Sequence, residues 1–75
     1  MKARYVEIGY TGERFNRTIR WENGPEEEFG VDREAREALD AGIRNAEFLG
    51  CPLFATVEAQ IALDRAGAFR AEVPS

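Results

Sequence analysis

The fold is decided by residues 4–21, which have the sequence RYVEIGYTGERFNRTIRW. In both halves of this stretch apolar side chains alternate with polar ones, a pattern typical of strands with one buried face. The halves are separated by Thr11-Gly12-Glu13, where the glycine suits a tight turn. The stretch therefore predicts a β-hairpin. Its buried face would carry the apolar side chains Val6, Ile8, Tyr10, Phe15, Ile19 and Trp21.

The segment after the hairpin combines chain-breaking residues with a run of carboxylates. Asn23-Gly24-Pro25 ends the strand pattern, because proline lacks the amide that a central strand needs. The run Glu26-Glu27-Glu28 is expected in a loop or in a short edge strand that ends near Phe29 and Val31. Asp32 predicts a helix N-cap, since its carboxylate can accept a hydrogen bond from an amide of the first turn.

Apolar residues at helical spacing predict an amphipathic helix over residues 33–49, which ends at Gly50. Leu39 and Ile43 are expected to pack from this helix onto the sheet. Phe48 falls off the apolar stripe and either folds over the helix end into the core or is exposed. Packing at the helix end is the preferred interpretation.

The last third of the chain allows two structures. Apolar residues alternate over residues 53–63, residues 64–67 contain a turn glycine, and the alternation resumes over residues 69–73. This pattern predicts a second hairpin, with Val57 on its buried face. The alternative is a helix over residues 57–66, favoured by residues of high helix propensity.

That helix would leave Val57 and Ile61 on the side opposite Leu63, so the second hairpin is preferred. The sequence thus predicts an α+β fold of order ββαββ, with one amphipathic helix packed on a mostly antiparallel sheet. Residues 1–75 are expected to form a single small domain.

Composition argues against an enzyme. The chain contains no histidine, so a general acid or base would have to be a carboxylate or lysine with a strongly shifted pKa. It also lacks phosphate-loop, paired-cysteine and nucleophile-elbow motifs. We therefore expect no catalytic residue, no cofactor and no metal. The lone Cys51 is expected to be a buried or half-buried structural thiol.

No apolar run approaches the length of a signal peptide or a membrane span. The expected location is cytoplasmic, in a bacterial host, with no membrane partner. The expected assembly is a monomer or a small homo-oligomer.

Charge is unevenly distributed along the chain. Residues 1–20 hold five cationic side chains and two carboxylates, whereas residues 21–75 hold five arginines and twelve carboxylates. The resulting net charges of +3 and −7 predict an acidic face that meets a basic surface of a protein partner. The candidate partner-binding residues are Glu26, Glu27, Glu28, Asp32, Glu34, Glu37 and Asp40.

Arg14, Arg17 and Arg20 support an alternative, a small regulatory DNA-binding or antitoxin-like protein. These arginines divide between two strand faces, and the net charge of the chain is −4, so no direct nucleic-acid binding is expected. Their expected partners are carboxylates of the hairpin region, Glu7, Glu13 and Glu22.

The layout of a hairpin over residues 5–21, a helix over residues 33–49 and a closing sheet segment over residues 53–73 resembles small anti-CRISPR proteins of phages and mobile elements. This resemblance implies a non-enzymatic inhibitor that binds a CRISPR effector complex and blocks its DNA recognition. The acidic residues would then face a basic DNA-binding surface.

Overall fold

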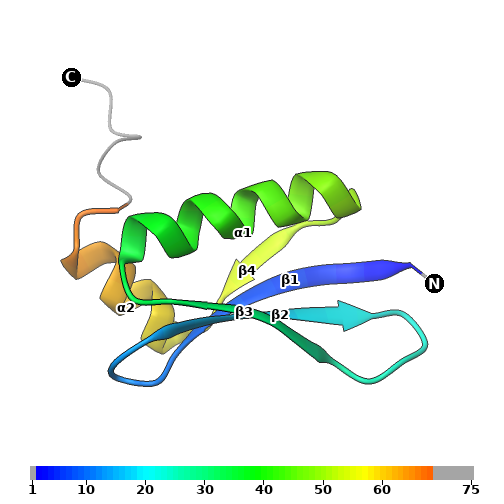
Figure 1. Cartoon of the computed structure of the whole chain (residues 1–75), viewed down its shortest axis with the longest axis horizontal. Helices are drawn as coiled ribbons and strands as arrows, with labels where there is room; N and C mark the ends of the chain where they lie inside the picture. The colour runs from blue at the N-terminus through cyan, green and yellow to red at the C-terminus, as the bar shows by residue number, and fades with distance from the viewer. Residues whose placement is uncertain (1, 69–75) are drawn as a thin grey trace.

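The computed structural model describes residues 2–68. Along the chain these residues form β1 (Ala3–Tyr10), β2 (Phe15–Trp21), β3 (Glu27–Asp32), α1 (Ala35–Leu49), β4 (Leu53–Ala55) and α2 (Val57–Arg65) (Figure 1). The strands lie in the order β3-β2-β1-β4; β2 is antiparallel to both of its neighbours, and β4 is parallel to β1. The predicted α+β fold with a mostly antiparallel sheet is confirmed.

The β1–β2 hairpin forms as its alternation predicts. Its register pairs Tyr10 with Phe15 and Val6 with Ile19, and Gly12 in the turn has a φ of 104°. Val6, Ile19 and Phe15 are buried against the helices. Burial of this inner face fixes the register, because a slip by one residue would expose every apolar side chain on it.

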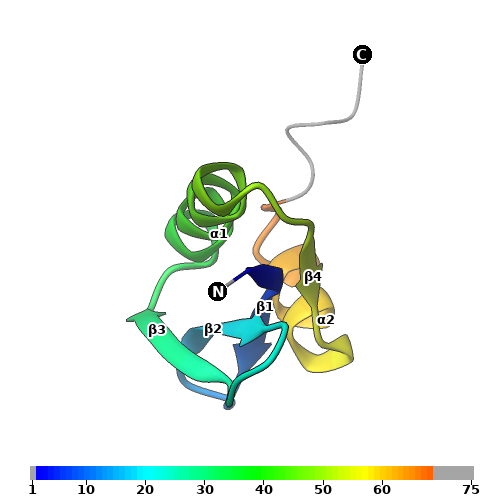
Figure 2. The ribbon, with the colours of Figure 1, turned by 90° about the vertical axis from the view of Figure 1, so that its right-hand side faces the viewer.

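The run of carboxylates enters the edge strand β3, one of the two expected outcomes. Within residues 2–68, β3 pairs with β2 on one side only, and the register shifts between Arg17 and Thr18, which leaves Phe29 as an extra residue on β3. Figure 2 shows β3 at the outer edge of the sheet, with α1 above the sheet. Bulges of this kind are common at sheet edges.

Helix α1 begins two residues later than predicted, and Asp32 is not its N-cap. Asp32 is the last residue of β3, and its side chain pairs with Arg17. The N-cap is Glu34, whose side chain makes no capping hydrogen bond. The helix ends as predicted at Gly50, which has a φ of 69°.

The preferred second hairpin is wrong, and the alternative helix is confirmed as α2. The Thr56 hydroxyl accepts a hydrogen bond of 3.1 Å from the Ala59 amide and caps α2, while Leu63 faces the core. Val57 and Ile61 are exposed. Local capping and helical spacing therefore prevail over the alternating pattern, and residues 69–73 of the expected hairpin lie outside the described residues.

Two side chains of α1 differ from their expected placement. Leu39 is buried as predicted, but Ile43 and Phe48 are exposed, the latter at 90% of its surface. Helical spacing places both outside the buried stripe, and neither belongs to the core clusters of the described residues. Cys51 follows the helix end as a half-buried free thiol, as predicted.

Candidate functional site

The candidate site is built around β3, the strand at the open edge of the sheet. Glu27 pairs with Ile19 and therefore lies on the helix side of the sheet, whereas Glu28 pairs with Thr18 and lies on the opposite side. Phe29 and Val31 are 50% and 47% exposed. We call residues 26–32 the acidic edge.

At the first end of the acidic edge, two carboxylates already have internal partners. The distance between Arg20 Nη1 and Glu26 Oε2 is 2.6 Å, and Trp21 Nε1 donates a hydrogen bond of 3.2 Å to Glu27 Oε1. Both carboxylates also line an open, largely apolar hollow with Trp21 and Pro25. Glu28 is exposed and makes no ion pair among residues 2–68.

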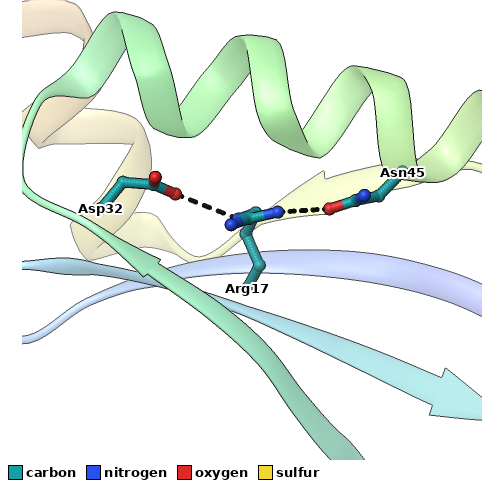
Figure 3. Close-up of polar contacts among 3 residues, drawn as sticks. All are labelled: Arg17, Asp32 and Asn45. Atoms are coloured by element: carbon teal, nitrogen blue, oxygen red, sulfur yellow. Dashed lines mark hydrogen bonds and ion pairs between the residues drawn. The ribbon is translucent and has the colours of Figure 1, made fainter.

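At the other end, Arg17 bridges three elements (Figure 3). From β2, its Nε donates a hydrogen bond of 3.0 Å to Asp32 Oδ2 on β3, and its Nη1 donates to Asn45 Oδ1 on α1. The guanidinium lies across Gly30, where a Cβ atom would clash with it. Arg17 therefore has a structural role, because its guanidinium links β3 to α1.

A polar hollow of about 420 Å³ lies between β3 and α1, lined in part by Arg17, Asp32 and Asn45. Glu37 and Asp40 line it from α1, together with Arg44. Asp40 also lies 3.9 Å from Arg36, an exposed pair of the kind that contributes little. The hollow therefore presents mixed charges to solvent.

The structure thus divides the seven predicted partner-binding residues into two groups and one outlier. The first three glutamates lie at one end of the acidic edge. Asp32 lies in the hollow with Glu37 and Asp40, while Glu34 lines neither hollow and is exposed at the start of α1.

The expected arginine partners were wrong. Arg17 pairs with Asp32, and Arg20 pairs with Glu26, because the register of β3 places those carboxylates beside β2. Arg14 is exposed in the β1–β2 turn. The inward position of Arg17 was visible in the alternation, whereas its contact with Asn45 could not be seen before α1 was placed.

Sequence reasoning also missed the exposed apolar residues Phe29 and Val31. Their alternation with Glu28, Gly30 and Asp32 was too short to show whether the strand lies at the centre or the edge of the sheet. In residues 2–68, no cluster of three or more metal-ligating side chains could hold a metal ion, and no helix is long and apolar enough to cross a membrane.

No protein-family model, curated protein or solved structure matches the chain.

Proposed function

We propose that this protein is a non-enzymatic protein-binding module whose acidic edge binds a basic surface of a partner. The observation that supports this function best is the combination of Glu26, Glu27 and Glu28 with exposed Phe29 and Val31 along a strand whose outer edge no other described strand pairs with. Carboxylates attract a basic partner over long range, and apolar side chains supply contact area once the two surfaces meet.

In its most specific form, the module inhibits a nucleic-acid-handling effector complex of the anti-CRISPR type in the bacterial cytoplasm. Proteins that bind DNA present lysines and arginines to the phosphates, so their binding surfaces are strongly basic. An acidic edge complements such a surface and would occlude it. This form is supported by charge and by the part of the resemblance in layout that rests on the β1–β2 hairpin and α1.

The placement of the arginines supports protein binding over DNA binding. Arg17 is held between Asp32 and Asn45, and Arg20 is paired with Glu26, so two of the three candidate phosphate contacts have internal partners. We therefore expect no duplex binding tighter than the usual non-specific range at physiological salt. Anisotropy titration against duplex DNA at several salt concentrations tests this expectation.

The main test is capture of a partner from a bacterial lysate by the tagged protein, followed by association kinetics with the identified partner. Replacing Glu26, Glu27 and Glu28 by lysine should slow association by about tenfold or more. The association rate of the wild-type protein should also fall as salt shortens the screening length, which is about 8 Å at physiological ionic strength.

A matched control separates the local effect from the change in net charge. Glu13, Glu47 and Asp64 are exposed and make no ion pair in the described part of the chain. Their replacement by lysine changes the net charge equally and should slow association much less. If the two triple variants slow association equally, or neither does, the acidic edge is not the binding surface.

A further inference from the structure

We propose that the partner supplies an extended segment with Lys or Arg at alternate positions, which adds to β3 as a further strand of the sheet. This inference rests on the proposed function and specifies how the acidic edge binds. An edge strand presents unpaired N–H and C=O groups, and recognition by strand addition uses them for affinity.

The geometry of β3 leaves room for such a strand. Among the strands of the described residues β3 is bonded only to β2, and Figure 2 shows no described element beyond it. Phe29 and Val31 are half exposed along this edge. An added strand would cover these apolar side chains while pairing its backbone with the outward groups of β3.

The charges on the helix side of β3 favour a partner strand that carries basic side chains at alternate positions. Pairing places Glu27 and Asp32 on this side, at opposite ends of β3. Asp32 lines the polar hollow together with Glu37 of α1. Asp32 is paired with Arg17, whereas Glu37 makes no ion pair within residues 2–68. Lysines on one face of the added strand would reach Glu27 and Glu37, and opposite charges across neighbouring strands stabilise pairing.

The same charges disfavour a second copy of this chain as the occupant. Full antiparallel overlap of two β3 strands would set Glu27 of each copy opposite Asp32 of the other. Like charges directly opposite one another destabilise a strand pair. The bulge at Phe29 also interrupts the regular edge that self-pairing would need.

The probe is a blocked synthetic peptide, TKVKVKVKT, titrated into the isotope-labelled full chain and followed by NMR. We expect the largest amide shifts, and new protection from hydrogen exchange, within residues 27–32. Two versions of the peptide carry N-methyl groups, one on the lysine amides and the other on the valine amides. Because only one set of amides can face β3, one version should weaken binding by about tenfold or more while the other binds nearly as the parent does.

Glu37→Gln tests the hollow, and Glu47→Gln on the exposed side of α1 is its matched control. The first should weaken peptide binding by about twofold to fivefold and the second should leave it unchanged. The glutamate analogue TEVEVEVET should not bind. Unchanged one-dimensional spectra of the variants verify that they are folded.

Several outcomes overturn strand addition. Equal binding of all three lysine peptides would show that charge attraction alone accounts for binding. Amide shifts centred on β4 or α2 would place the site elsewhere. Concentration-dependent dimers with shifts on β3 would identify a second copy as the occupant. If capture of the partner depends on Glu26, Glu27 and Glu28 but no peptide binds, strand addition fails while the proposed function stands.

Discussion

The two sides of the β2–β3 ladder contain similar ion pairs in very different surroundings. On the helix side, Arg17 and Asp32 are 14% and 20% exposed, and Asn45 provides a further acceptor for the guanidinium. On the other side, Arg20 and Glu26 are 43% and 52% exposed. The comparison shows that burial, rather than the presence of an ion pair, decides which contacts hold this fold and which remain available to a partner.

Buried and exposed positions can also be compared on α2, where we expect the greatest loss of stability. Leu63→Ala should lower the free energy of unfolding by about 2–5 kcal/mol, because this side chain is fully buried in the core. Ile61→Ala should lower it by less than about 1 kcal/mol, because Ile61 is half exposed on the opposite side. Chemical denaturation of both variants measures the difference.

This pair of variants also distinguishes the helix from a hairpin. In a strand, residues 61 and 63 would lie on the same face, and their truncation would have similar effects. Equal losses of stability would therefore contradict α2 and the division of this segment into an inner and an outer side.

The second effect compares the two arginines directly. Arg17→Ala should lower the free energy of unfolding by about 1–3 kcal/mol, because it leaves the half-buried carboxylate of Asp32 and the amide oxygen of Asn45 without their donor. Arg20→Ala removes an exposed pair and should cost about 1 kcal/mol or less. Similar denaturation midpoints for the two variants would contradict the conclusion that burial decides which ion pair stabilises the fold.

The parts of the fold that sequence could predict are those with a long periodic pattern. Alternation over residues 4–21 was sufficient for β1 and β2, and helical spacing with a terminal glycine was sufficient for α1. Residues 53–65 were different, because their apolar residues fit both a strand and a helix, and the alternation favoured the strand, which was wrong. Capping by Thr56 and burial of Leu63 against the other elements decided between the two structures.

The candidate site was less predictable than the fold, since it depends on contacts between elements. The run of glutamates was evident from the sequence, but the register with β2 determined that Arg20 and Trp21 would contact two of them. Asp32 is of a residue type that favours helix N-caps, yet its position beside Arg17 gives it a different role. Neither contact leaves a local signal in the sequence.

The smallest change in stability is expected at two glycines, each of which allows a polar side chain on β2 to lie across it. Gly30 pairs with Arg17 on the helix side, and Gly9 pairs with Asn16 on the other side. A Cβ atom at either glycine would press on that side chain. Displacement matters for Arg17, which holds two hydrogen bonds, but little for Asn16, whose Oδ1 has no partner in the described part of the chain.

Gly30→Ala should therefore cost about 1 kcal/mol in the wild-type protein and nothing in the Arg17→Ala background, where no guanidinium has to move. The corresponding cycle with Gly9→Ala and Asn16→Ala should give a coupling energy below about 0.5 kcal/mol. Denaturation of the single and double variants supplies both coupling energies. If the coupling between Gly9 and Asn16 equals the coupling between Gly30 and Arg17, close packing alone, and not the half-buried ion pair of Arg17, accounts for both coupling energies.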